Sequence, residues 1–289
     1  MEYRKETRKI IMDKIKLITD STCDLTQELI EKYDIHVLPL SVHIGDKSYK
    51  DGESITLTEM YEGVEKGSAF PTTSQVNPQE FHDVYKKYLD EGYKIVSFHI
   101  SALLSGTIQS AEIAKDMLET EDITIVDSKG VSGVLFLALV EAGEKIRAGA
   151  SLDEVVTTLK ETSEKVKLLA TFDTMEYLVK GGRVPKSVGA IGGFLGIKPL
   201  ISIKEGKLEM VDKARGSKKA LKSLLAFIDS TPRKKDSKVV VINSLDSEVN
   251  RAVISHLEKS GIGYHEIEVG CVLGVHAGPK LVGIFVLTD

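Results

Sequence analysis

A serine-rich turn between a strand and a helix is the part of the sequence best suited to binding an anion. The apolar run 95–100 predicts a buried strand, which leads directly into the turn Ser101–Thr107. Apolar residues then recur every three or four positions from Ile108 to Leu118, which indicates an amphipathic helix. The turn would therefore carry the unpaired N–H groups and positive dipole end of a helix N-terminus, which favour a carboxylate or phosphate. The simpler interpretation, that Ser105 only caps the helix, stays open on this stretch alone.

Hydroxyl-bearing turns also follow two other predicted strands. The strand that begins at Ile15 ends near Ser21, and the strand that begins at Ile123 ends at Ser128. The alternation of strands and helices predicts a mainly parallel sheet with helices on both faces, and such sheets bind ligands beyond the carboxyl ends of their strands. A hydroxyl-rich loop around Thr73 could reach the same edge. We therefore expect a ligand-binding edge on this sheet.

The length and the change in pattern along the chain predict two domains. We place them at residues 14–165 and 166–289, after an extension of residues 1–13. In the first domain we expect a single strand over 35–44 and a loop over 70–78.

Three features of the second half support a separate domain. Ser151–Glu154 forms a predicted capping box, which starts the helix that leads into it. A hairpin turns at Glu205–Gly206, with its second strand expected over 208–211. A strand, a helix and a strand then span 238–269. The apolar run 188–197 contains four glycines, which favours close approach of another group to its backbone.

Composition excludes several classes of function. The 289 residues carry a formal net charge of -5, which argues against a nucleic-acid binder. The two cysteines, Cys23 and Cys271, have no metal-ligand spacing and suggest a reducing, cytoplasmic location. No apolar run reaches the length of a membrane span. The basic segment 1–16 lacks the apolar core of a secretory signal, and a transient membrane contact through it is a weaker alternative.

Common catalytic and nucleotide-binding motifs are missing. The turn after the first strand contains no glycine, so a Rossmann fingerprint is absent, and there is no P-loop. Ser105 does not stand in the G-x-S-x-G pattern of a nucleophile elbow. A hydrolase or acyl transferase of another design, with Ser105 as nucleophile and His99 or His276 as base, stays open because triads are defined by geometry.

Five short motifs follow one another along the chain. They are Thr72-Thr73-Ser74-Gln75, Ser101-x-x-Leu104-Ser105-Gly106-Thr107-x-Gln109-Ser110-Ala111, Leu178-x-Lys180-Gly181-Gly182-Arg183, Ile197-Lys198-Pro199 and His276-x-Gly278-Pro279. Together they resemble the DegV family of fatty-acid-binding proteins, from about residue 14 to the end. The resemblance implies an α/β, DegV-like two-domain fold. Its N-terminal domain would hold a Rossmann-like, mainly parallel sheet, and its C-terminal domain would also be α/β.

The resemblance also implies a function. Such a protein binds one long-chain fatty acid, such as palmitate, between its domains. It is a carrier rather than an enzyme, it needs no cofactor or metal, and it presents the carboxylate to a separate ATP-dependent fatty acid kinase. A lipid sensor without a kinase partner is a further alternative.

The site residues are carried over from the matching motifs. The hydroxyls of Thr73 and Ser105 are expected to bind the carboxylate, and Ser74, Gly106, Thr107 and His276 complete that set. No buried cation is required there. The glycine-rich segment should line the tunnel for the acyl chain through Gly192, Gly193, Phe194 and Leu195.

Two further positions matter for the resemblance. Arg215 lies in a cationic run, Lys213–Lys219, that resembles the family segment whose arginine contacts the kinase, so we expect Arg215 to dock the partner. The alternative, that the run is an ordinary solvated face, stays open. Lys280 stands where the family usually has glycine after His-x-Gly-Pro. A residue that permits positive φ is therefore missing, and the resemblance does not fix the loop around His276.

Overall fold

The first sheet of the computed structural model, which describes residues 14–184 and 196–289, is entirely parallel. Its strands are β1 (Ile15–Asp20), β2 (His36–Leu38), β6 (Lys94–His99) and β7 (Ile123–Asp127), in the order β2-β1-β6-β7. The interiors of β1 and β6 are buried on both faces, which explains their continuous apolar runs. The predicted parallel sheet is confirmed.

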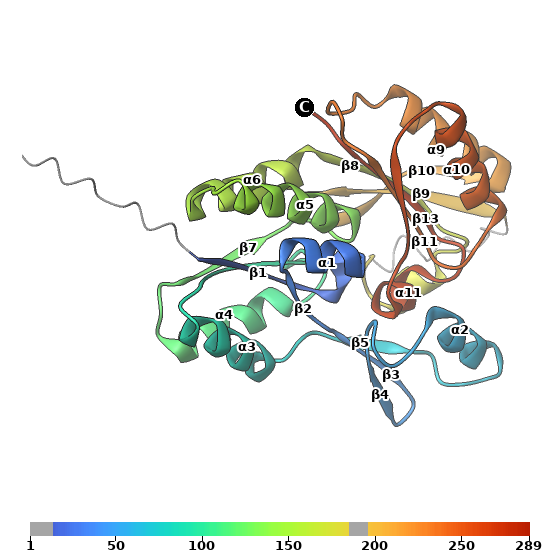
Figure 1. Cartoon of the computed structure of the whole chain (residues 1–289). Helices are drawn as coiled ribbons and strands as arrows, with labels where there is room; N and C mark the ends of the chain where they lie inside the picture. Colours follow the sequence, from blue (N-terminus) through green and yellow to red (C-terminus); the bar gives the residue numbers. More distant parts are fainter. Residues whose placement is uncertain (1–13, 185–195) are drawn as a thin grey trace, which may run out of the picture.

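Helices cover both faces of this sheet (Figure 1). One face is covered by α3 (Pro78–Asp90) and α4 (Thr107–Leu118), and the other by α1 (Gln27–Tyr33), α5 (Gly133–Arg147) and α6 (Leu152–Lys165). Pro78 lies in the first turn of α3, and the predicted capping box of Ser151 with Glu154 starts α6. None of the described helices is long and apolar enough to cross a bilayer.

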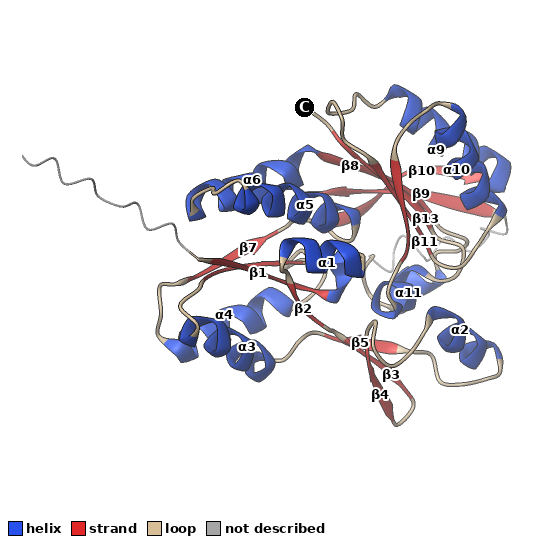
Figure 2. Ribbon diagram, viewed as in Figure 1, coloured by secondary structure: helices blue, strands red, loops and turns tan. Residues whose placement is uncertain are grey.

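The second sheet is mixed (Figure 2). Its strands are β8 (Val166–Thr171), β9 (Ile197–Lys204), β10 (Lys207–Arg215), β11 (Val239–Asn243), β12 (Tyr264–Glu268) and β13 (Val282–Leu287), in the order β10-β9-β8-β13-β11-β12. Only β11 and β12 pair in parallel, because α10 (Glu248–Lys259) connects them as a crossover. The outer face packs against α9 (Ser217–Ser230) and α10, while α5 lies against the inner face.

A smaller antiparallel sheet projects from the first half of the chain. It consists of β3 (Ser41–Ile44), β4 (Lys47–Lys50) and β5 (Thr72–Ser74), and α2 (Leu57–Glu65) lies beside it. The single strand predicted over 35–44 is wrong, because the chain leaves β2 at Pro39 and joins a different sheet. The loop predicted over 70–78 contains β5, whose Thr73 pairs with Val42.

Three short helices and the β9–β10 hairpin complete the chain. The helices are η1 (Ser21–Cys23), α7 (Glu176–Lys180) and α11 (Cys271–Ala277). The hairpin turns at Glu205 and Gly206 as predicted, but β10 extends to Arg215 rather than ending at Val211. The first part of the cationic run therefore belongs to a strand, and only its end opens α9.

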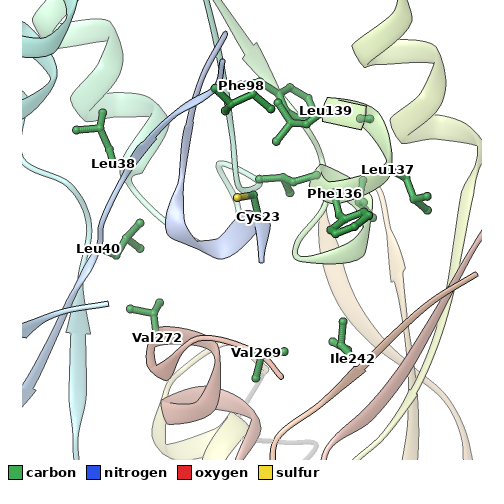
Figure 3. Packing of buried hydrophobic residues seen from close by; sticks show 14 of the residues in the cluster. Cys23, Leu38, Leu40, Phe98, Phe136, Leu137, Leu139, Ile242, Val269 and Val272 are labelled. Carbon is green, nitrogen blue, oxygen red and sulfur yellow. The ribbon is translucent and has the colours of Figure 1, made fainter. Parts of the chain in front are cut away.

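One apolar core joins the two halves of the chain. Figure 3 shows Leu38 and Phe98 from the first sheet, Phe136 and Leu139 from α5, and Ile242 from the second sheet among its members. The chain is thus an α/β protein with two sheets that share a layer of helices, as the predicted two-domain fold requires. The exact boundary between residues 165 and 166 stays a prediction.

Candidate functional site

Thr73 and His276 meet at one end of a cavity between the small sheet and α11. Thr73 is held by β5 and His276 by α11, and the distance between Thr73 Oγ1 and His276 Nε2 is 2.9 Å. The other ring nitrogen, Nδ1, is buried and has no hydrogen-bond partner among the described residues. It lies against Gly181, where the Cβ of any other residue would overlap the ring.

Burial keeps His276 neutral. Desolvation, reinforced by the nearby charge of Arg183, lowers the pKa of His276 to about 3. Orphaned buried N–H groups are rarer than unpaired acceptors, so we assign the ring proton to Nε2 rather than Nδ1. The ring then donates to Thr73 Oγ1, and the hydroxyl hydrogen of Thr73 is free to be donated to a ligand.

Ser105 lies at the same end of the cavity, beyond the carboxyl end of β6. Its Oγ is 2.8 Å from Thr107 Oγ1, and it also accepts a 3.3 Å hydrogen bond from the Thr107 N–H. Ser105 thus contacts the first turn of α4 and lines the cavity as well. A Cβ at Gly106 would overlap the amide end of the Gln75 side chain, so a larger residue there would displace Gln75. Thr107 is buried behind Ser105.

The cavity has a polar end and an apolar body. Thr73, Ser74, Gln75, Ser105, Arg183 and His276 line the polar end, and Leu40, Ile100, Leu104, Val131, Leu208, Val272 and Leu273 line the rest. An adjoining cavity shares Val131, Leu208, Leu273 and His276 with it. Its other walls are almost entirely apolar and include Leu168, Phe172 and Phe285. The two cavities together therefore offer a mainly apolar surface with a cluster of polar groups in one of them.

Arg183 is a site residue that the sequence analysis did not assign. Its Nε donates to the Leu104 carbonyl at 3.1 Å and its Nη1 to the Gly181 carbonyl at 2.6 Å, and no described carboxylate forms an ion pair with it. Burial lowers its pKa. The motif Gly181-Gly182-Arg183 was the available signal. The sequence required no buried cation at this site, but the structure adds the Arg183 guanidinium to the cavity wall.

The other predicted hydroxyls have different surroundings. Ser74 lines the cavity and its Oγ is 2.9 Å from His43 Nε2. Ser21 donates to Asp51, and Ser128 bonds the backbone of Gly130, so both hold loops together. Neither of these two lines the cavity. Of the three predicted strand-end serines, only Ser105 lines the cavity, and Thr73 reaches it from β5.

His99, one of the two candidate bases, forms no hydrogen bond with Ser105, because both of its ring nitrogens have other partners. It is fully buried, with Nδ1 2.9 Å from Asp20 Oδ2 and Nε2 2.6 Å from Ser97 Oγ. Ser97 Oγ is in turn 2.6 Å from Tyr85 OH. Asp20, His99 and Ser97 have the residue types of a catalytic triad. All three are buried in the core, where no substrate reaches them.

Lys280, which stands where the family usually has glycine, adopts a positive φ in the loop after His276. Lys280 adopts a φ of 63° and Gly278 a φ of 74°. The loop is held by Ser244, whose Oγ donates to the Gly278 carbonyl at 2.6 Å and accepts from the Leu281 N–H at 3.0 Å. The predicted tunnel residues Gly192, Gly193, Phe194 and Leu195 lie outside the described residues.

The fold and the cavities define a class: a two-domain α/β protein with two adjoining, mainly apolar cavities, one of which is also lined by hydroxyl groups, a histidine and an arginine. Comparison with known families agrees. The model of the DegV family, a family described as uncharacterised proteins, matches residues 14–289. The chain belongs to the DegV family.

Relatives and solved structures match along nearly the whole chain. A DegV domain-containing protein of Clostridium perfringens is 38% identical, with 96% of this chain and 100% of the relative covered. The fold matches a fatty-acid-binding DegV family protein of Thermus thermophilus with a TM-score of 0.87 and 34% identity, over 96% of this chain and 100% of the other. A stearic acid-binding protein of Eubacterium ventriosum matches with a TM-score of 0.83 and 27% identity, over 95% and 98% of the two chains.

Proposed function

We propose that this protein binds one long-chain fatty acid, with the carboxylate at the polar end of the cavity and the acyl chain in the apolar part. The observation that carries the proposal is the pair of adjoining cavities, which are lined mainly by apolar residues and, in one of them, by hydroxyl donors and one arginine. Fatty acid binding by solved relatives supports the same ligand class.

The acyl chain would supply most of the affinity. Burial of about 15 methylene groups at about 0.8 kcal/mol each offers roughly 12 kcal/mol before losses. Hydrogen bonds to a charged head contribute about 1.5 to 3 kcal/mol each, and the freedom lost on binding offsets much of the total. Thr73, Ser105 and Arg183 would therefore fix the position of the carboxylate, while the apolar walls retain the ligand.

The finer part of the proposal is that the protein is a carrier, not an enzyme. It would present the fatty acid, for instance palmitate, to a separate ATP-dependent kinase that forms the acyl phosphate. The exposed Arg215 on β10 supports a docking role, and two buried free thiols, Cys23 and Cys271, fit a reducing cytoplasm.

The hydrolase alternative has less support. A general base must lie within hydrogen-bond reach of the nucleophile, whereas Ser105 Oγ contacts only Thr107 among the described residues. His276 contacts Thr73 instead, and its pKa of about 3 makes it a weak base at neutral pH.

The proposal is tested with Thr73→Ala and Ser105→Ala. Each removes one donor to the carboxylate and leaves the apolar walls intact, so we expect the stoichiometric fatty acid seen by native mass spectrometry to fall while thermal unfolding changes little. The control is Ser151→Ala, which removes a helix cap distant from the cavity and should cost about 1 kcal/mol of stability without loss of lipid. Full lipid occupancy in both site variants would refute the assignment of the head group. Turnover of an ester substrate would favour the hydrolase.

A further inference from the structure

A second cavity lies on the outer face of the second sheet, away from the proposed carboxylate site. Its volume is about 360 Å³, within the range of small-molecule sites. It lies beyond the carboxyl ends of β8 and β11, where α9 and α10 begin, and Phe172 is the only lining residue that it shares with the apolar cavity. Ligands of α/β sheets bind at such strand ends.

The N-terminus of α9 opens into this cavity. Ser217 and Ala220 from its first turn line the wall, and its N-cap, Gly216, provides no side chain to accept from the first N–H groups. The first turn contains no acidic residue. Those N–H groups and the dipole of a 14-residue helix therefore favour a bound anion.

Thr171 gives independent evidence for a ligand. It is 4% exposed, and its Oγ1 has no hydrogen-bond partner among the described residues. The register pairs Thr171 with Leu200 and Val282, two residues that pack toward α9 and α10, so its side chain points to the same face as this cavity. A buried hydroxyl without a partner costs free energy, which an acceptor or donor on a ligand would recover.

The charged residues of the wall leave one ammonium group available. Lys198 is paired with Asp173, and Arg251 with Asp246. Lys280 has no described carboxylate partner, and it lines the cavity from a left-handed conformation that disfavours a lysine. Glu248 on the opposite wall can accept from hydroxyl groups. The wall thus combines an anion-binding end with a hydrogen-bond acceptor.

We propose that this cavity binds the phosphate group of a small phosphorylated, hydroxyl-bearing molecule. The phosphate is held by the first turn of α9, Lys280 and the hydroxyl of Thr171. This site is separate from the fatty acid site, and its test does not depend on whether a fatty acid is bound.

The test is a titration of the ¹⁵N-labelled full-length protein with inorganic phosphate and with glycerol 3-phosphate, at ionic strength held constant with chloride. We expect saturable shifts of the amide signals of Ser217, Lys218 and Lys219. Lys280→Gly should weaken this binding about tenfold and raise the melting temperature, because it removes a charge and relieves the positive φ.

Two further variants distinguish a specific site from general charge effects. Lys129→Gly is the matched control, since Lys129 is exposed at a φ of 47° and does not line this cavity. It should gain stability without loss of phosphate binding. Thr171→Val should weaken binding while the protein stays folded. Shifts that do not saturate, or equal weakening by Lys129→Gly and Lys280→Gly, would overturn the proposal.

Discussion

At the scale of single residues, the neutral state of His276 decides what Thr73 can do. With the ring proton on Nε2, the imidazole donates to Thr73 and leaves the threonine hydroxyl as a donor to the carboxylate. A protonated ring would need a partner for Nδ1, and the described surroundings provide none. The site is therefore arranged to bind an anion with a neutral histidine in contact with it.

This arrangement predicts a pH dependence of stability. The pKa of His276 is about 3 in the folded state and about 6.5 when unfolded, so the unfolded chain binds more protons between these values. Stability is then lost as pH falls through this window, by about 1.4 kcal/mol per pH unit. We expect the advantage of the wild type over His276→Gln in urea unfolding to grow from pH 4 to pH 6. A difference that is independent of pH would contradict the buried, neutral histidine.

The sequence motifs predicted the hydroxyl groups of the candidate site, but they did not predict that the Arg183 guanidinium also lines it. Thr73 and His276 come from motifs 203 residues apart, and the structure places the Thr73 hydroxyl against the His276 ring. Arg183 was part of a motif, but nothing in its local sequence shows that its guanidinium would lack a carboxylate partner. That property depends on which residues the fold brings around it.

At the scale of elements, α11 is fastened to the first half of the chain at its N-terminus. Asp24 accepts from the Gly270 N–H at 3.1 Å, and Asp51 accepts from the Val272 N–H at 3.2 Å. Both carboxylates belong to segments around the first and third sheets, whereas α11 carries His276 at its other end. These contacts therefore position the ring that contacts Thr73.

The ionisation of Asp24 should change stability with pH in the direction opposite to that of His276. Burial, opposed by hydrogen bonds from Ser132 and Gly270, raises its pKa to about 7. The folded protein then binds more protons than the unfolded chain between about pH 4 and 7, so this contribution to stability is lost as pH rises. We expect the stability of the wild type relative to Asp24→Asn to fall from pH 5 to pH 7.5 in urea unfolding. The absence of a slope over this range would show that Asp24 stays ionised in the folded protein.

Tertiary pairing explains the elements that local patterns did not predict. The stretch around Thr73 has a loop-like composition, yet it becomes β5 because β3 offers it a partner strand. Likewise β10 continues to Arg215 because β9 pairs with it along its whole length, past a shift in register between Met210 and Asp212. The helix α6 begins where its capping box predicts, because that signal is local.

At the scale of the whole molecule, the shared apolar core makes the two halves one binding unit. Residues from the first sheet, α5 and the second sheet belong to a single buried cluster, and the proposed fatty acid cavity is lined from both halves. Loosening this core would therefore release ligand and lower stability together, whereas a surface used only by a partner can be altered alone.

Arg215 lies on a surface that can be altered without changing the core or the proposed fatty acid cavity. It ends β10, it is exposed, and it lies next to the exposed Lys218 and Lys219 in a chain of net charge -5. An arginine can bind a partner carboxylate through two hydrogen bonds, so reversing its charge should weaken association far more than folding. We expect Arg215→Glu to retain its fatty acid and its melting temperature but to abolish acyl phosphate formation when the cognate kinase and ATP are added at physiological salt. Lys235→Glu makes the same change of charge in the loop beyond the other end of α9 and should leave phosphorylation intact. Equal rates for Arg215→Glu and the wild type would rule out Arg215 as the docking residue, while equal losses in both variants would reduce its role to general electrostatic attraction.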